Sequence, residues 1–441
     1  MLYRILKFIF SYAIRKYFVR LTVLNKERIP LDKPVILLPN HRSAFMDPIV
    51  IAANIDRKTH FLTRGESFTR PMLVKIFNSL GMIPIYRKEH NPDKVDQNKN
   101  IFRHCFRLME DKGCLMIFPE GICQTKYLLA PLKTGAARIA LEAEDKNNFE
   151  LDIHLIPVGI NYSNPHRFRG NVTLTVGEPI RTKDYQNAYQ SDAWKTTDDV
   201  TSEIDKGLRD CIITVEDQEQ VQMVQQIERY VSFHPVKGSE DWFVSWQTIN
   251  KFLNRIHAEI PNAYEELRFR LTHYVGSLNR LGLTGSNSLI DLSKRDLQNL
   301  IIARGAFLIL GFPLFLVGFV LHILPFYLTR KLSLTVVKRV DFMGSVVLAL
   351  GVLLFSISAI VETWLVWKYS QNILITILFF LVLPSLGLFA YHYSSRWVRW
   401  RESVKLRRVR KSRKRIIQQL MLDRSEIESL LQSGLDQIKG S

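Results

Sequence analysis

The stretch that decides the fold reads PVILLPNHRSAFMDP and covers residues 34–48. Its first part, Pro34-Val35-Ile36-Leu37-Leu38, is an unbroken apolar run, typical of a parallel strand that is buried on both faces of a sheet. A loop with His41 follows, and Asp47 stands where a helix would begin. A histidine whose second ring nitrogen is held by a carboxylate can take a proton from a hydroxyl at neutral pH. The pattern therefore suits attack by a substrate alcohol on an acyl group.

The same residues also allow a purely structural interpretation. Asp47-Pro48 is a common helix start, with aspartate as the N-cap and proline at the first helical position. A single histidine at the end of a strand is most often a hydrogen-bonded surface residue. The catalytic interpretation therefore depends on the motifs that accompany this pair.

Three further apolar segments end in residues that suit a binding site. GMIPIYRK at 81–88 predicts a short strand that ends in paired cations. LMIFPEG at 115–121 predicts a strand closed by Pro-Glu-Gly, and LIPVGI at 155–160 predicts another strand. A late strand is expected over 173–177. The helices are expected over 48–55, 70–80, 95–112 and 135–143.

Strands and helices thus alternate from residue 25 to about residue 185, which is the signature of an α/β layer fold. We expect a mixed sheet flanked by helices. Four sequence blocks, in the order in which they occur, resemble the glycerolipid acyltransferase family over about residues 26–190. The blocks are the His-to-Asp motif, the strand that ends in Arg, Phe-Pro-Glu-Gly and the final strand with its proline.

One departure from the family pattern is the spacing of the first block. Five residues separate His41 from Asp47, where the family usually has four. This spacing is similar to that of the fungal-type glycerol-3-phosphate/dihydroxyacetone-phosphate acyltransferase branch. One extra residue inside a helix would turn Asp47 by about 100°. We therefore expect the connecting residues to form a loop.

The resemblance implies transfer of a fatty acyl chain from a thioester, acyl-CoA or acyl-carrier protein, to a glycerol phosphate hydroxyl. By motif match, His41 is the expected general base and Asp47 its orienting partner. Glu120 and Gly121 match the family's substrate-binding block. Arg87 is the expected phosphate ligand, because a guanidinium can bind two phosphate oxygens at once. An arginine after a strand is also often merely solvated.

Two other cations, Arg64 and Lys133, are secondary phosphate candidates near the expected site loops. Glu120 cannot bind phosphate itself, so it is expected to accept the acceptor's hydroxyl groups or to orient Arg87. A structural salt bridge is the alternative for Glu120. The sequence has neither a Walker loop nor a His-Glu-x-x-His pattern. We therefore expect no metal and no cofactor beyond the acyl donor.

The leading hypothesis is a membrane-bound glycerol-3-phosphate or dihydroxyacetone-phosphate O-acyltransferase of phospholipid biosynthesis. Its near alternative acylates 1-acylglycerol-3-phosphate (lysophosphatidate). A CoA-independent transacylase is a third hypothesis. An alternative of another class is a catalytically inactive scaffold that binds membrane lipids. The intact set of His41, Asp47, Arg87 and Glu120 argues against that scaffold.

The net charge of +18 is concentrated at the two ends of this 441-residue chain. Residues 1–20 contain five basic and no acidic side chains, and residues 396–415 contain eleven basic and one acidic. The rest is nearly neutral, which argues against a nucleic-acid binder. Both clusters flank apolar sequence, so anionic lipid head groups are the expected partner. A solvated or disordered charge run is the alternative for the C-terminal cluster.

Residues 2–24 carry polar residues in steps of three and four, opposite an apolar face; these are Arg4, Lys7, Ser11, Arg15, Lys16 and Arg20. This pattern predicts an amphipathic helix lying in the lipid head groups. A helix packed on the domain has the same pattern. The expected division of the chain is an interfacial helix at 1–25, an acyltransferase domain at 26–190, an accessory helical region at 191–300, membrane helices at 301–395 and a basic tail at 396–441.

Three uncharged runs at 305–324, 343–361 and 373–393 are each about long enough to cross a bilayer. Three full crossings would place the basic tail opposite the enzyme domain, against the positive-inside tendency. A re-entrant first helix, broken by Gly311, Pro313 and Gly318, would leave the domain and the tail on the cytoplasmic face. We favour that arrangement. Four cysteines in a chain of this length suggest reduced thiols in a cytosol-facing domain.

Overall fold

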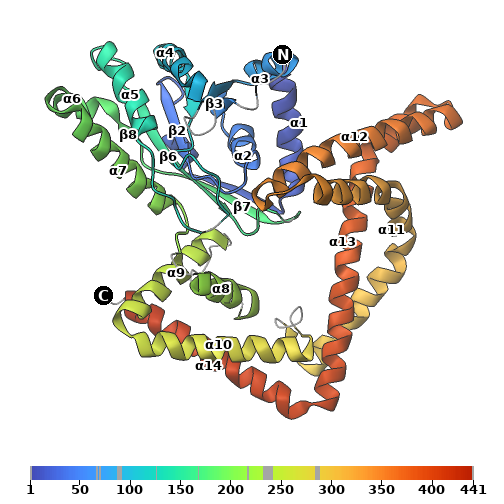
Figure 1. Cartoon of the computed structure of the whole chain (residues 1–441). Coiled ribbons are helices and arrows are strands. Elements are labelled where there is room, and N and C mark those ends of the chain that lie inside the picture. The colour runs from blue at the N-terminus through green and yellow to red at the C-terminus, as the bar shows by residue number, and fades with distance from the viewer. Residues whose placement is uncertain are drawn as a thin grey trace. The chain divides into compact units, whose positions relative to one another are not determined.

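The computed structural model describes the whole chain except residues 1, 66–67, 69–70, 87–91, 126, 167, 216–217, 232–241, 284–288 and 440–441. The described residues form two compact units. The first unit joins residues 1–214 to residues 333–349, and the second joins residues 215–332 to residues 350–441. Figure 1 shows the helices and strands of both.

The first unit is built on a mixed eight-stranded sheet with the order β1-β7-β6-β2-β5-β3-β4, and β8 pairs with β6. Strands β6, β2, β5, β3 and β4 run parallel, whereas β7 is antiparallel to β6. The strands are β1 (Arg20–Leu24), β2 (Val35–Pro39), β3 (Thr59–Arg64), β4 (Met82–Ile85), β5 (Cys114–Met116), β6 (His154–Tyr162), β7 (Asn171–Val176) and β8 (Ile180–Arg181).

The central strands are apolar along their whole length because helices cover both faces of the sheet. All five residues of β2 are buried, as are eight of the nine in β6. On one face, α4, α5 and α7 pack with the strands in a single apolar core. Helices α1 and α2 lie against the opposite face (Figure 1). This confirms the predicted α/β fold and the predicted strands β2, β4, β5, β6 and β7.

Four helices of the first unit, α2 to α5, match the predicted segments to within a few residues, and the full set of helices follows. They are α1 (Leu2–Tyr17), α2 (Met46–Asn54), α3 (Pro71–Ser79), α4 (Asn98–Glu110), α5 (Gly135–Lys146), α6 (Gln186–Ser191) and α7 (Ala193–Cys211). Short 3-10 turns are η1 (Lys26–Arg28), η3 (Pro92–Gln97) and η4 (Thr182–Tyr185).

The N-terminal helix is shorter than predicted. It ends at Tyr17, and residues 20–24 form edge strand β1 of the sheet, so the predicted helix over 2–24 is wrong at its end. The predicted polar face also does not all point away from the protein. Lys7 Nζ donates to the carbonyl of Ile55 at 2.6 Å and Ser11 Oγ to that of Ala53 at 3.2 Å. The end of α2 has free carbonyl groups, which attract such donors.

The second unit is helical. Its described elements before the membrane region are α8 (Gln218–Gln226), the π-helical turn η5 (Ile227–Val231), α9 (Trp242–Glu259) and α10 (Pro261–Leu281). This agrees with the helical pattern predicted for residues 191–300. The predicted tail after residue 396 is also helical: α13 continues to Ser412, and α14 (Lys414–Lys439) follows.

Three described helices are long and apolar enough to cross a membrane: α11 (Lys294–Val336), α12 (Met343–Ser370, preceded by η7, Val340–Phe342) and α13 (Ile373–Ser412). Less than a fifth of the most apolar stretch of each is buried within the protein. Exposing so much apolar surface to water would be strongly unfavourable. This part of the chain is therefore membrane-associated, as the three uncharged runs predict.

We predict that Gly159→Ala destabilises the first unit. A Cβ at Gly159 in β6 would overlap the carbonyl oxygen of Cys211 at the end of α7. That carbonyl also accepts a bond from Asn161 Nδ2 at 2.9 Å, so it is not free to move. Overpacking of this kind costs about 1–3 kcal/mol, and thermal unfolding in detergent measures it.

The matched control is Gly135→Ala at the start of α5, where an added Cβ meets nothing within 4 Å. We expect its Tm to equal that of the wild type or to rise slightly, because alanine favours helix more than glycine. Equal melting temperatures for the two variants would refute the close approach of α7 to β6.

Candidate active site

The candidate catalytic residues lie at the carboxyl ends of the parallel strands. His41 follows the end of β2, Glu120 follows β5, and Tyr162 ends β6. Asp47 lies in the first turn of α2. Because these three strands are neighbours and run parallel, their ends meet at one edge of the sheet. Ligands of open α/β sheets bind at this edge.

The structure brings His41 and Asp47 together. Nδ1 of His41 lies 2.8 Å from Oδ2 of Asp47. The residues between them form a loop, as predicted, and the helix starts only at Met46. Nδ1–H donates to the carboxylate, so Nε2 is the ring nitrogen left to accept a proton.

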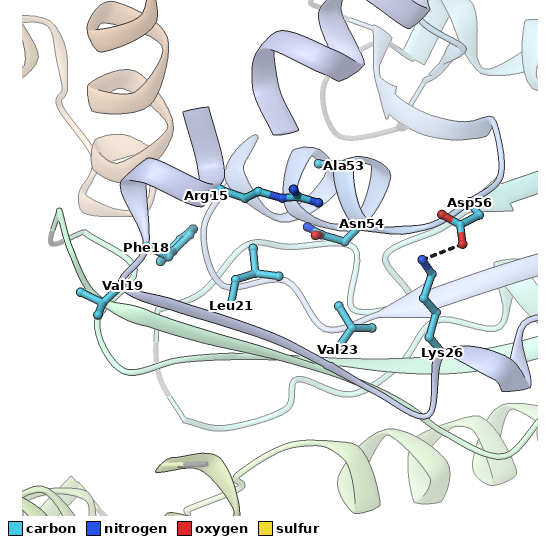
Figure 2. Close-up of a pocket in the computed structure, with 9 residues that line it drawn as sticks. All are labelled: Arg15, Phe18, Val19, Leu21, Val23, Lys26, Ala53, Asn54 and Asp56. Carbon is cyan, nitrogen blue, oxygen red and sulfur yellow. Dashed lines mark ion pairs between the residues drawn. The ribbon is translucent and has the colours of Figure 1, made fainter. Parts of the chain in front are cut away.

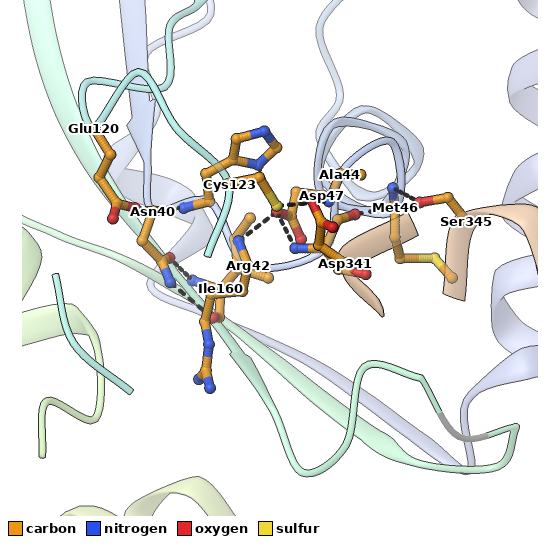
Figure 3. A network of polar contacts seen from close by, with 12 residues as sticks. Asn40, Arg42, Ala44, Met46, Asp47, Glu120, Cys123, Ile160, Asp341 and Ser345 are labelled. Atoms are coloured by element: carbon orange, nitrogen blue, oxygen red, sulfur yellow. Dashed lines mark hydrogen bonds and ion pairs between the residues drawn. The ribbon is translucent and has the colours of Figure 1, made fainter. Parts of the chain in front are cut away.

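The carboxylate of Asp47 is completely buried and is bonded by four donors. Figure 3 shows Asp47 beside Arg42 in this network. Besides the imidazole, the backbone N–H groups of Arg42 and Ser43 each donate to Oδ2 at 2.8 Å. The hydroxyl of Tyr162 donates to Oδ1, also at 2.8 Å. Asp47 therefore binds amides that precede it in the chain. This differs from the N-cap interpretation, in which it would bind amides that follow it.

The imidazole of His41 is also fixed from its other sides. Its ring stacks on Phe118 with the centroids 4.1 Å apart. Its backbone N–H donates to Oε1 of Glu120 at 2.7 Å. The His41 side chain keeps 19% of its surface exposed. It is thus held in one orientation but remains open to a substrate.

Glu120 uses both of its oxygens within the protein. Oε1 accepts from His41, and Oε2 accepts from the N–H of Ala130 at 3.0 Å and from Gln124 Nε2 at 3.3 Å. Burial raises the pKa of the Glu120 carboxyl, and these bonds oppose the shift. This geometry favours a positioning role. Its predicted roles as substrate ligand and as partner of Arg87 stay predictions.

Of the three predicted phosphate-binding cations, the structure describes Arg64 and Lys133 but not Arg87. Arg64 ends β3, two strands from β2 in the sheet, or about 10 Å at the usual spacing. The side chain of Lys133 lies beside Gly121: a Cβ added at this glycine would be 3.1 Å from the lysine Cδ and Cε. Gly121 has a φ of +66°. Arg87 lies outside the described residues.

The sequence did not predict that Tyr162, Phe118 and Arg42 take part in the candidate site. Tyr162 and Phe118 occupy predicted strand ends, but no motif marks them as partners of Asp47 and His41. Arg42 is almost completely buried, donates to the carbonyl of Thr125 at 3.2 Å and lies over the ring of Tyr127 at 3.8 Å. An arginine between a histidine and an aspartate in the motif could have signalled a loop anchor.

Cys123 also lies at this loop, where its Sγ accepts the N–H of Ala44 at 3.1 Å. Burial, and then the charge of Asp47, raise the pKa of its thiol to about 12. The thiol is therefore protonated at neutral pH and is a poor nucleophile. This favours direct attack by a substrate hydroxyl over an acyl-cysteine intermediate.

A pocket of about 580 Å³ lies elsewhere in the first unit, between α1, β1 and α2 (Figure 2). Its lining includes Arg15, Leu21, Val23 and the ion pair Lys26–Asp56. No residue of the His41–Asp47 loop lines it. This pocket is thus separate from the candidate catalytic pair.

The histidine–aspartate pair and the buried glutamate lie within a part of the chain that matches a known protein family. Residues 20–161 match the family model described as Acyltransferase. This part of the chain is therefore an acyltransferase-family domain.

Among curated proteins, the chain is similar to glycerol-3-phosphate O-acyltransferase 1 of Saccharomyces cerevisiae, with 34% identity over 141 residues. The alignment covers 31% of this chain and 18% of that protein. It is also similar to a 1-acyl-sn-glycerol-3-phosphate acyltransferase of Chlamydomonas reinhardtii, with 28% identity over 127 residues, which is 29% of this chain and 36% of that protein. The chain thus spans well under half the length of these relatives.

Among solved structures, a match is the 1-acyl-sn-glycerophosphate acyltransferase PlsC from Thermotoga maritima. The sequences are 18% identical and the TM-score is 0.34, with 46% of this chain and 78% of that chain covered.

We predict that Asp47→Asn folds like the wild type, whereas Asp47→Ala does not. Asparagine can keep an oxygen toward His41 and the two amides, while the Tyr162 hydroxyl turns to accept from its NH2 group. Alanine leaves all four donors unpaired, at about 1–3 kcal/mol for each buried group. Thermal unfolding should therefore separate the two variants.

The asparagine variant, compared with Tyr162→Phe, tests the electrostatic role. Asp47→Asn removes the charge that stabilises an imidazolium, so acyl transfer should fall by about 100-fold or more. Tyr162→Phe keeps the charge and is expected to lose far less activity. An asparagine variant with wild-type turnover would contradict this role.

Proposed function

We propose that this protein is a membrane-bound O-acyltransferase that acylates glycerol-3-phosphate or dihydroxyacetone phosphate from acyl-CoA or acyl-carrier protein. The observation that carries the proposal is the 2.8 Å contact between His41 Nδ1 and the buried Asp47 carboxylate at the carboxyl edge of the sheet. The acyltransferase-family domain and the similarity to the yeast enzyme support it.

In the proposed reaction, Nε2 of His41 removes the proton of the acceptor hydroxyl as its oxygen attacks the thioester carbonyl carbon. Asp47 stabilises the imidazolium that forms. The C–S bond then breaks, the proton passes to the departing thiolate, and the products are an ester and a free thiol. The donor is consumed as a co-substrate, and we propose that no resident cofactor or metal takes part.

The phosphate of the acceptor is proposed to bind cations at the same edge of the sheet. Lys133 is exposed beside Gly121, in the loop that also carries Glu120. Arg64 stands at the end of β3. We propose that the Arg64 side chain extends toward β5 and contacts the phosphate of the acceptor while the acceptor hydroxyl lies at His41. Arg87, after the end of β4 in the sequence, is proposed as the bidentate phosphate ligand.

A second candidate acceptor is 1-acylglycerol-3-phosphate. The similarity to the Chlamydomonas enzyme of that name favours it. The same base and the same cations would serve this acceptor, because it too presents a glycerol hydroxyl and a phosphate.

The test is thiol release from acyl-CoA by the full-length protein in detergent or vesicles, with glycerol-3-phosphate, dihydroxyacetone phosphate and lysophosphatidate offered separately. We expect thiol release with one of the first two acceptors. His41→Ala should lower it by about 100- to 10,000-fold, the usual contribution of a general base.

The matched control is His104→Ala, which removes an exposed histidine on α4. It should leave the rate unchanged. Undiminished turnover in His41→Ala would dismiss His41 as the base. Thiol release with lysophosphatidate alone would select the second candidate.

We further propose that α11 is re-entrant and that only α12 and α13 cross the membrane. Within the first unit, Ser345 at the start of α12 bonds to the catalytic loop, which supports a common side for the end of α11 and the domain. No described helix of residues 215–293 is apolar and long enough to cross, so α11 starts from that side too. The structure has α11 as one uninterrupted helix through Gly311, Pro313 and Gly318, where the sequence predicts a break. A re-entrant path therefore requires a kink rather than a break, and Pro313 and Pro325 inside the helix favour one.

The second unit supports the same arrangement for the C-terminus. Arg424 in α14 pairs with Asp291 at 2.7 Å and donates to the carbonyl of Val231 at 3.0 Å. Both partners precede α11, so an even number of crossings separates them from α14. The basic segment 396–415 and the enzyme domain would then share the cytoplasmic face, where anionic lipids are abundant.

The exposed side of α1 supports lipid contact on that face. Ile5, Phe8 and Tyr12 are exposed there, with Arg4 and Lys16 beside them. Apolar side chains bordered by cations suit an anionic membrane surface.

A labelling experiment tests the proposed topology. In sealed microsomes, whose outer surface is cytoplasmic, an impermeant maleimide should label Lys338→Cys, between α11 and α12, as readily as Trp194→Cys on the enzyme domain. Gln371→Cys, in the turn between α12 and α13, should react only after permeabilisation. All three positions are exposed in the structure.

The wild type, with its four native cysteines, gives the background. Protection of Lys338→Cys together with labelling of Trp194→Cys would show that α11 crosses the membrane.

A further inference from the structure

The segment 339–345, which precedes α12 and includes its first turn, contacts the loop that holds Asp47, and both belong to the first unit. Oγ of Ser345 accepts the N–H of Met46 at 2.9 Å and donates to the carbonyl of Ser43 at 3.3 Å (Figure 3). Ser345 is only 5% exposed. A single hydroxyl therefore joins the two ends of the turn that immediately precedes Asp47.

Two neighbouring residues of the segment extend this contact. The ring of Phe342 lies edge-on to Phe45, with the centroids 5.9 Å apart. The carboxylate of Asp341 is buried beside Cys123, the residue whose sulfur accepts the N–H of Ala44. Each loop residue from 43 to 46 thus meets the segment directly or through Cys123.

Gly344 makes the close approach possible. A Cβ at this position would overlap the carbonyl oxygen of Pro165 and would lie 3.4 Å from Oγ of Ser43. Any other residue would clash with the backbone at Pro165 and so displace the start of α12, which also lies against Ser43. This glycine is therefore a steric requirement of the contact.

The loop needs such external support. Ala44 has a φ of +30°, a region that residues with a side chain rarely adopt and that persists only when the surroundings impose it. Inside the loop, the turn is closed by the bond from Met46 N–H to the Ser43 carbonyl at 2.8 Å. Ser345 bonds to the same two groups and so clamps this turn.

We propose that the segment 339–345 is a working part of the active site, and that Ser345 is a positioning residue that fixes the turn before Asp47. By holding that turn, it keeps the carboxylate against His41. The catalytic consequence rests on the proposed function, whereas the contact itself does not. The first turn of a membrane helix would thereby set the geometry of the general base.

The experiment compares Ser345→Ala and Gly344→Ala with two matched controls. Ser333→Ala removes a buried hydroxyl that has no hydrogen-bond partner in the described structure. Gly351→Ala adds a Cβ to the same helix α12 where nothing lies within 4 Å. Each control therefore repeats one test substitution at a residue whose side-chain position has no described hydrogen bond or close contact with the loop.

We expect Ser345→Ala and Gly344→Ala to lower kcat by about 10- to 100-fold, the effect of small misplacements of a catalytic group. The KM values should change little, because the substrate ligands are untouched. A less well-placed Asp47 stabilises the imidazolium less, so the acid limb of the kcat profile should move to lower pH. A role in overall folding alone would not move that limb.

Hydrogen–deuterium exchange of the full-length protein gives a readout that needs no substrate. Peptides covering residues 40–50 should exchange faster in both test variants than in both controls. Test variants that match the controls in exchange and in kcat would overturn the proposal. If the wild type acylates no acceptor, the proposed function fails, and exchange alone decides the contact: faster exchange upholds it, and unchanged exchange overturns it.

Discussion

The fully buried carboxylate of Asp47 is the constraint on which the rest of the site depends. A buried charge is costly unless it is well bonded. Three of its four donors come from the residues just before it, His41, Arg42 and Ser43, so the loop must wrap around the carboxylate. The five-residue spacing accommodates that wrap. Because His41 supplies one of these donors, the loop conformation that bonds the Asp47 carboxylate also sets the orientation of the imidazole.

The sequence predicts the centre of the sheet better than its edges. Strands β2 and β6 are apolar throughout because helices cover both faces, and their runs are recognisable without other information. Strand β1, RLTVL, follows the N-terminal helix after two residues, and its apolar residues continue the helical pattern. Strand β3, THFLTR, is only partly buried and mixes polar with apolar residues. Neither was predicted, since partial burial leaves no clear period.

Within the site, the local motif was predictable and its distant partners were not. His41 and Asp47 lie six positions apart, so one loop can bring them together. Tyr162 reaches Asp47 only because β6 pairs with β2 in one register. Glu120 was recognised from its motif, yet its bond to the backbone of His41 depends on the order of β2 and β5. No sequence pattern marks Ser345, which meets a loop about 300 positions earlier in the chain.

In the contact between α12 and the catalytic loop, a comparison of energies indicates which of the two sets the position of the other. One hydrogen bond from Ser345 contributes only about 1 kcal/mol. Helix α12 leaves most of its apolar length uncovered by the rest of the protein, and each apolar side chain kept from water contributes about 1.5–3 kcal/mol. The bilayer therefore fixes the depth of the helix, and the loop conforms to the helix. Under the proposed function, a loop that takes part of its shape from a membrane helix would place His41 at the lipid boundary, where a soluble glycerol phosphate and a membrane-retained product would share one site.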